Sequence, residues 1–189
     1  MSAINQFRRC STLPMIIAVV FSVAVPKEAM AEPPVLQTNG PIIYLADNLD
    51  EKDGLGWCID TLGRGQSEQL QTHSCKPQSG SSNRNADIKF SFDKSSGEIR
   101  SATYQNQCMT VLDAGSEVQF GLLDCNGTVR QQFVYVEDTG FISPIDQRGT
   151  CVVAGSSSRS AGPYMSRGLI LGACDEVDSS LSSWRILGD

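Results

Sequence analysis

Six of the seven cysteines are arranged in three consecutive pairs, an order that favours disulfide chemistry. Composition alone leaves every pairing of six cysteines open. However, the first members of the pairs recur at intervals of 50 and 43 positions, and the spacing within the pairs is 17, 17 and 23. Three copies of one local bridge explain this recurrence. We therefore predict the disulfides Cys58–Cys75, Cys108–Cys125 and Cys151–Cys174.

The remaining chemistry is limited because His73 is the only histidine in the chain. A serine or cysteine nucleophile usually needs a histidine base that is held by a third group. The predicted disulfides leave no thiol for catalysis and no thiolate cluster for zinc. The acidic stretch 47–54 lacks the closing glutamate and the spacing of an EF-hand loop. The two carboxylates of a glycosidase could still meet on any scaffold. These residue types favour a protein that is not an enzyme and that holds no metal ion or cofactor.

The segments that carry the cysteines repeat three times and are typical of short strands. Each repeat has a cysteine followed by apolar residues, an apolar run into a second cysteine, and then a strand with Phe90, Phe133 or Trp184. Turn-forming stretches, of which 155–162 is one of the longest, separate these runs at roughly ten-residue spacing. With a first strand at 42–46, the sequence predicts an all-β, barrel-like fold of about twelve strands in three repeats of ~45 residues.

Residues 1–31 have the pattern of a secretory signal peptide. Arg8 and Arg9 form a basic region, Leu13 to Val25 an apolar one, and Ala29-Met30-Ala31 a cleavage site of the A-x-A type. The apolar region is shorter than the roughly 18 to 20 residues that span a bilayer. We therefore expect cleavage near Ala31 and export to the periplasm or the medium, where disulfides persist.

The rest of the chain predicts one domain with an acidic surface. Residues 42–189 suffice for one core and are too few for two, and residues 32–41, with three prolines, form a leader outside that domain. The chain has a net charge of −6, and loss of residues 1–31 makes it more negative. Such a charge repels a phosphate backbone, so we do not expect nucleic acid or an anionic membrane surface as a partner.

The sequence resembles the ricin-B type β-trefoil lectin family over roughly residues 42–187. The disulfide spacing is the specific part of the likeness. The other parts are the Cys-apolar-Asp run Cys58-Ile59-Asp60 and the end-of-repeat Q-x-W, reduced here to Gln131-Gln132-Phe133 and Ser182-Ser183-Trp184. The resemblance implies a β-trefoil in which the aromatic residue at the end of each repeat packs in the core.

The resemblance also implies a shallow sugar pocket in the first repeat. In that family an aspartate two positions after the first cysteine, an aromatic residue two before the second, and a polar residue ahead of the Q-x-W bind the sugar. The matching residues here are Asp60, His73 in place of the usual tryptophan or tyrosine, and Asp87 in place of the usual asparagine. A carboxylate accepts charge-assisted hydrogen bonds from sugar hydroxyls, and a ring covers the apolar face.

Other interpretations of these residues stay open at this point. Asp60 could cap a turn at the end of a strand, and His73 could be a half-exposed strand residue beside a disulfide. In the second repeat the matching positions supply neither a carboxylate nor a ring, because they are Thr110, Leu123 and Arg130. In the third repeat they supply nothing polar, because they are Val153, Gly172 and Leu181. At most one pocket is therefore predicted to be intact.

Three functions fit this sequence. The first is a secreted carbohydrate-binding module that holds a terminal sugar of unknown identity. The second is a trefoil subunit that binds a protein partner without sugar, similar to the lectin-like subunits of cytolethal distending toxins. The third is a β-trefoil protease inhibitor, against which the threefold cysteine pattern argues. We expect the first.

Overall fold

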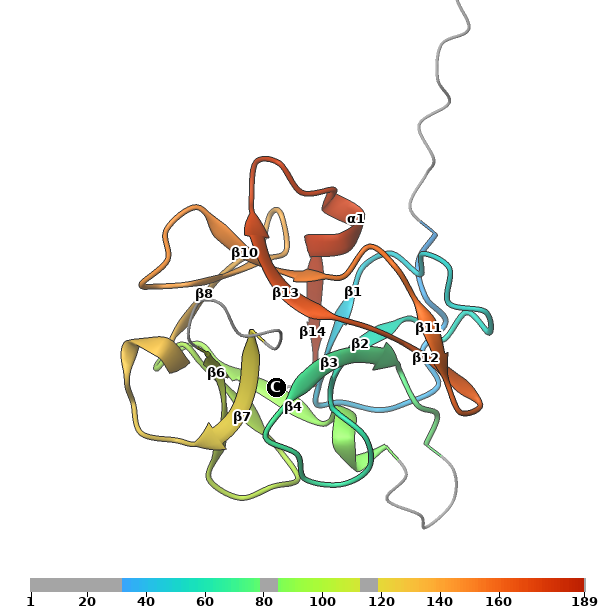
Figure 1. The fold of residues 1–189 in the computed structure, drawn as a ribbon, viewed down its shortest axis with the longest axis horizontal. Helices are drawn as coiled ribbons and strands as arrows, with labels where there is room; N and C mark the ends of the chain where they lie inside the picture. Colours follow the sequence, from blue (N-terminus) through green and yellow to red (C-terminus); the bar gives the residue numbers. More distant parts are fainter. Residues whose placement is uncertain (1–31, 79–84, 113–118, 189) are drawn as a thin grey trace, which may run out of the picture.

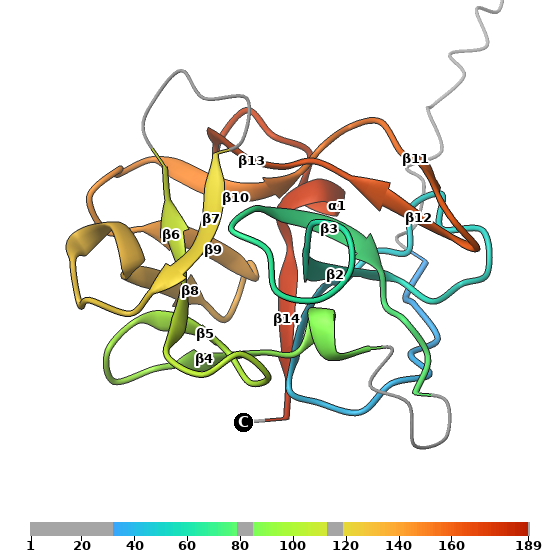
Figure 2. The same ribbon diagram turned by 60° about the horizontal axis from the view of Figure 1, so that its bottom comes forward.

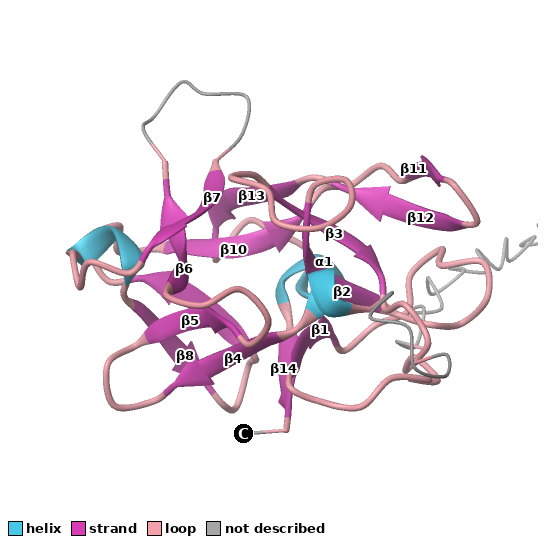
Figure 3. Cartoon of the chain, turned by 90° about the horizontal axis from the view of Figure 1, so that it is seen from below, coloured by secondary structure: helices cyan, strands magenta, loops and turns pink. Residues whose placement is uncertain are grey.

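Short strands connected by turns make up most of the structure, a computed structural model that describes residues 32–78, 85–112 and 119–188 (Figure 1). Apolar β-branched and aromatic residues recur in these strands, while glycine and polar residues occupy many of the turns, as strand propensity and turn geometry require. Helix in these residues is limited to three short segments (Figure 3). None of these segments has the length and hydropathy of a transmembrane span.

The first two repeats each contain four strands, and the third contains the same four and an added hairpin. The first repeat consists of β1 (Ile42–Leu45), β2 (Trp57–Thr61), β3 (Leu70–Ser74), the 3₁₀ helix η1 (Ala86–Ile88) and β4 (Phe90–Asp93). The second consists of β5 (Glu98–Ser101), β6 (Gln107–Val111), β7 (Phe120–Asp124), the 3₁₀ helix η2 (Val129–Gln131) and β8 (Phe133–Val136). The third consists of β9 (Phe141–Pro144), β10 (Thr150–Ala154), β11 (Arg159–Ala161), β12 (Tyr164–Arg167), β13 (Leu169–Ala173), α1 (Ser179–Ser182) and β14 (Trp184–Leu187).

The prediction of a turn over residues 155–162 is wrong for Arg159–Ala161, which form β11. The polar residues there form a strand because β12 pairs with β11 on one side and with β3 of the first repeat on the other. The order of strands in the largest sheet is accordingly β11-β12-β3-β2-β1-β14. Contacts between distant parts of the chain thus create a strand that local composition does not indicate.

The first and last strands close the fold. Strand β1 pairs antiparallel with β14 from Ile42↔Leu187 to Leu45↔Trp184, and its other edge meets β2. The remaining strands form a four-stranded sheet, β4-β5-β6-β7, and the pairs β8-β9 and β10-β13. Residues 32–41 lie outside the strands but are attached to the domain: Val35 N donates to Gly54 O at 2.7 Å. The predicted signal peptide, residues 1–31, lies outside the described residues.

The three predicted disulfides are confirmed. In each repeat one cysteine lies on the first strand of a central pair and the other directly follows the second strand, as in Cys58 on β2 and Cys75 after β3. The sequence separations are 17, 17 and 23. The longer third separation accommodates the β11–β12 hairpin. Closing loops of this length restricts the unfolded chain, which in the chain-entropy model contributes about 3 kcal/mol per bridge.

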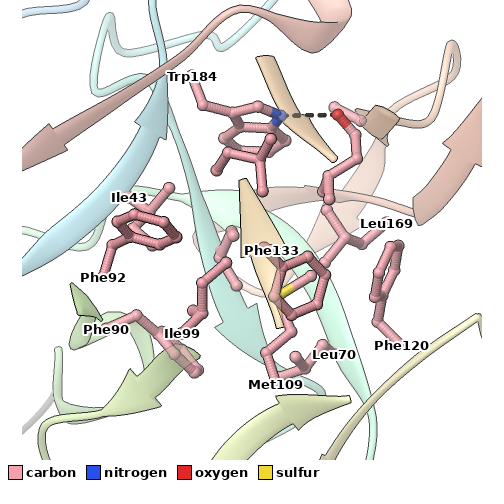
Figure 4. Packing of buried hydrophobic residues seen from close by; sticks show 14 of the residues in the cluster. Ile43, Leu70, Phe90, Phe92, Ile99, Met109, Phe120, Phe133, Leu169 and Trp184 are labelled. Atoms are coloured by element: carbon pink, nitrogen blue, oxygen red, sulfur yellow. Dashed lines mark hydrogen bonds between the residues drawn. The ribbon is translucent and has the colours of Figure 1, made fainter. Parts of the chain in front are cut away.

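The core confirms the expected role of the aromatic residues that end each repeat. Phe90, Phe133 and Trp184 are 0%, 2% and 0% exposed. Trp184 also satisfies its only polar atom, because its Nε1 donates to Val152 O at 2.8 Å (Figure 4). Apolar side chains from all three repeats surround them, among them Ile43, Leu70, Phe92, Ile99, Met109, Phe120 and Leu169 (Figure 4).

Replacement of Trp184 tests this packing. Trp184→Ala leaves a cavity among side chains from different repeats, so we expect it to lower the free energy of unfolding by about 3–5 kcal/mol. Trp184→Phe keeps most of the packing and loses the hydrogen bond, so its loss is expected to be about 1–3 kcal/mol. Urea denaturation with the disulfides intact measures both. Equal losses for the two variants would contradict the packing role.

Candidate functional site

The residues predicted to bind sugar gather around one cavity of the first repeat. His73 on β3 and Asp87 in η1 line it, and Asp60 lies behind it on β2. The cavity has a volume of about 1000 Å³. Its walls come from the β2–β3 loop, η1, the turn at Thr103 and Tyr104, and the β11–β12 hairpin of the third repeat. The site is therefore built from all three repeats.

Lys76 is the central residue of the site, and it was not identified from the sequence because it lies outside the family motif. Its Nζ donates to Asp60 Oδ1 at 3.1 Å, to Asp60 Oδ2 at 3.2 Å and to Asp87 Oδ2 at 3.2 Å. The Lys76 side chain is only 8% exposed, and those of Asp60 and Asp87 are 0% and 10% exposed. The three groups thus form a nearly buried cluster of one ammonium and two carboxyl groups.

Asp60 supports the floor of the cavity and does not face it. It is completely buried, and its Oδ2 accepts a second hydrogen bond from Gln71 Nε2 at 3.3 Å. Both carboxylate oxygens therefore already have protein partners. Asp60 does not line the cavity itself. Its hydrogen-bond partners Lys76 and Gln71 do.

Asp87 connects three parts of the cavity wall. Its Oδ1 accepts hydrogen bonds from Tyr104 Oη at 2.7 Å and from Gly65 N at 3.1 Å, while its Oδ2 faces Lys76. Gly65 has a φ of +81°, a left-handed conformation that favours glycine. Asp87 thereby fixes the β2–β3 loop against η1. Tyr104 was not identified from the sequence because it lies in a turn after the first repeat.

His73 forms an aromatic pair with Tyr164 from the inserted hairpin. The ring centroids are 5.7 Å apart with an angle of 68° between the planes, an edge-to-face arrangement. His73 is 6% exposed, and its Nδ1 lies 3.0 Å from Ser74 O. Tyr164 reaches the site because Ser166, two positions later on β12, pairs with His73. The unusual spacing of the third cysteine pair was the only sequence signal of this contact.

Burial sets the protonation of the site. Burial raises the pKa of Asp60 to about 7, against the opposing charge of Lys76. It lowers the pKa of His73 to about 4, which keeps the imidazole neutral at pH 7. Burial and the hydrogen bond to Asp87 raise the pKa of Tyr104, so the hydroxyl stays a donor. No three metal-ligating side chains gather in the described ranges 32–78, 85–112 and 119–188.

The positions of the second and third repeats that match Asp60 and His73 have different residue types. In the second repeat, Thr110 is 6% exposed and its Oγ1 accepts a hydrogen bond from Gln131 Nε2 at 2.9 Å. In the third, Val153 is 3% exposed in the core, and a Cβ at Gly172 would lie 2.6 Å from Val177. Neither position offers a carboxylate to a ligand.

Comparisons with known proteins agree with this architecture. The sequence matches the family model described as the ricin-type beta-trefoil lectin domain over residues 49–182. No curated protein sequence gives a significant match. The structure is similar to the beta-trefoil lectin of the Vibrio vulnificus hemolysin/cytolysin, solved with N-acetyl-D-lactosamine bound, at 14% identity and a TM-score of 0.51, covering 77% of this chain and 91% of that one. It is also similar to the mdaA-1 domain, at 14% identity and a TM-score of 0.53, covering 84% of this chain and 98% of that one. At these identities the two structures show a shared fold.

The buried carboxylate predicts a pH-dependent stability. Because the pKa of Asp60 is raised from 3.8 to about 7, the folded protein binds an extra proton between these pH values. The contribution of Asp60 to stability is therefore full below about pH 4 and is lost as the pH rises to 7. The lowered pKa of His73 has the opposite sign, since stability from a neutral buried imidazole increases as the pH rises.

Asp60→Asn separates the two effects, because it leaves His73 in place. We expect the free energy of unfolding of the wild type, minus that of Asp60→Asn, to fall as the pH rises from 4 to 7. The slope for one proton is at most about 1.4 kcal/mol per pH unit. Urea denaturation across this range measures it, with Asp138→Asn, an exposed carboxylate in the β8–β9 turn, as the control. A difference that does not change with pH would contradict the assignment.

Proposed function

Because this chain belongs to the ricin-type beta-trefoil lectin family, we propose that it is a carbohydrate-binding module whose sugar site is the cavity of the first repeat. One observation carries the choice of site. Asp87 and Lys76 of the first repeat supply a carboxylate and an ammonium to one cavity, and Tyr104 and Tyr164 of the other repeats add aromatic rings to its lining. This combination binds both the hydroxyls and the apolar face of a sugar ring.

The proposed contacts with the sugar use hydrogen-bond acceptors at the floor of the cavity that the protein itself leaves free. Oδ1 of Asp87 already accepts two hydrogen bonds, but Oδ2 accepts only one, from Lys76. Oδ2 therefore keeps a lone pair with which Asp87 can accept from a sugar hydroxyl. Gln71 and Lys76 present polar atoms beside it, and the Tyr164 ring offers an apolar surface. Asp60 acts through Lys76, which it holds in place, and His73 orients the Tyr164 ring.

The proposal assigns no catalytic step to the cavity. In a glycosidase, two carboxyl groups flank the bond that is cleaved and must both reach the substrate. Asp60 and Asp87 instead share the Lys76 ammonium between them, and Asp60 is fully buried. The His73 imidazole is also nearly buried and lies against a backbone carbonyl. These groups are placed for binding.

We also propose that the protein works outside the cytoplasm. Three disulfides are stable in an oxidising compartment, such as the periplasm or the extracellular medium. The signal peptide predicted for residues 1–31 would direct the chain there. Weak binding by one pocket would then need several copies or a fused partner to become useful.

Binding of a protein partner without sugar is a second candidate function. An exposed apolar group on and beside the β8–β9 hairpin favours it, because Val134, Val136 and Ile145 are 50%, 42% and 38% exposed. This candidate predicts that no glycan binds. The family membership and the cavity of the first repeat favour the carbohydrate-binding module.

Glycan binding by residues 32–189 tests the proposed function. We expect a glycan array to identify a bound sugar, and Asp87→Asn to weaken its binding at least about tenfold, because charge-assisted hydrogen bonds to the sugar are lost. The Asn side chain keeps an acceptor for Tyr104 and Gly65, and Lys76 keeps its ion pair with Asp60. Circular dichroism checks that the variant is folded. Calorimetry gives the affinities. Arg130→Gln, at the matching position of the second repeat, is expected to leave binding unchanged. A folded protein that binds no glycan at millimolar concentration would refute the proposal.

A further inference from the structure

The β11–β12 hairpin belongs to the third repeat in sequence but to the first repeat in space. Its strand β12 pairs with β3 through Ser166↔His73 and Arg167↔Thr72 (Figure 2). The backbone N–H of Met165 donates to Ser74 Oγ at 3.0 Å. The matching cysteine pairs of the first two repeats are separated by 17 positions each, against 23 in the third, which holds the hairpin. The cavity thus has a wall that only this insertion provides.

The base of the hairpin is held by a buried guanidinium. Arg167 is 4% exposed, and its charge lies 4.7 Å from the centre of the Trp57 ring. Its Nη1 donates to Gly155 O at 2.6 Å, and its Nη2 pairs with Asp50. A cation over an aromatic face and two hydrogen bonds keep the strand in register. The wall is therefore fixed before any ligand arrives.

Two exposed arginines that are distant from each other in the sequence line the cavity. Arg159 lies on β11, and Arg64 lies in the β2–β3 loop. Arg159 Nε donates to Ser166 Oγ at 3.1 Å, which orients the guanidinium. Within the part of the chain that the structure describes, both terminal amino groups of Arg159 and the whole guanidinium of Arg64 have no hydrogen-bond partner.

The charges of the cavity favour an anion at its rim. The buried cluster of Lys76, Asp60 and Asp87 contributes at most one net negative charge at the floor, and the two arginines contribute two positive charges closer to solvent. The rim is therefore positive although the chain has a net charge of −6. Guanidinium groups bind carboxylates through parallel N–H donors, a geometry that suits Arg159 and Arg64.

We propose that the ligand of this cavity is an acidic saccharide, whose carboxylate pairs with Arg159 and Arg64 while its hydroxyls face Asp87 on the floor. This inference rests on the proposed function and names its ligand class. Two sources carry the required chemistry: glycans that end in a sialic acid, and polysaccharides built from uronic acids. Both combine a carboxylate with a hydroxylated ring.

Calorimetry with matched acidic and neutral probes tests the inference. We expect 3′-sialyllactose to bind at least about tenfold more tightly than lactose, or methyl β-D-glucuronide to do so relative to methyl β-D-glucoside. The pair that shows the preference identifies the source. Added salt is expected to weaken binding of the acidic probe and to leave that of the neutral probe unchanged. Arg159→Gln and Arg64→Gln should each reduce the preference, and Arg148→Gln, an exposed arginine that does not line the cavity, should keep it.

The outcomes separate this inference from the proposed function. Loss of the preference in Arg159→Gln or Arg64→Gln, but not in Arg148→Gln, supports it. Equal binding of acidic and neutral probes overturns the acidic ligand and leaves the lectin function standing, as does a preference that survives both cavity variants. Failure of the folded wild type to bind any of the four probes or any glycan on an array overturns both.

Discussion

The ammonium of Lys76 lies between the carboxylates of Asp60 and Asp87, and this contact joins strand β2, the segment after β3 and the helix η1. Removing Lys76 would leave two buried carboxylates without their cation, which costs several kcal/mol. The arrangement of the cavity depends on this contact. Asp87 can hold the β2–β3 loop through Gly65 only because its own position is fixed by Lys76 and Tyr104.

The threefold fold lets a single repeat acquire such a site. Three disulfides and a shared aromatic core stabilise the trefoil. The first repeat can therefore bury charged residues, while the matching positions of the second and third hold Thr110 and Val153 in apolar or hydrogen-bonded surroundings. The third repeat contributes instead the β11–β12 hairpin, which completes the cavity of its neighbour.

Local patterns in the sequence predicted the parts of the structure that depend on spacing. The cysteine intervals were enough for the three disulfides, and the resemblance to the ricin-B type lectin family correctly implied the core positions of Phe90, Phe133 and Trp184. The pairing of β12 with β3 was missed, because a polar stretch becomes a strand there only through a partner distant in sequence.

The candidate site could be predicted only in part, for the same reason. The family pattern selected Asp60, His73 and Asp87, which do lie around one cavity, but no pattern shows that Asp60 is covered by Lys76. Tyr164 likewise enters the site through tertiary pairing. Residues that come together from separate repeats have no fixed spacing in the sequence. A sequence motif therefore identifies the site residues that belong to it, but not the residues that surround them in the folded protein.

Nuclear magnetic resonance of the ¹⁵N-labelled protein during titration with 3′-sialyllactose tests the account most directly, because it locates the ligand on the backbone. The amide of Gly65 is an internal reporter, since it donates to Asp87 at the floor of the cavity. We expect the largest chemical-shift changes at Gly65 and its loop, and along the β11–β12 hairpin. Changes centred on the second repeat or on the β8–β9 hairpin, or no changes at all, would contradict it.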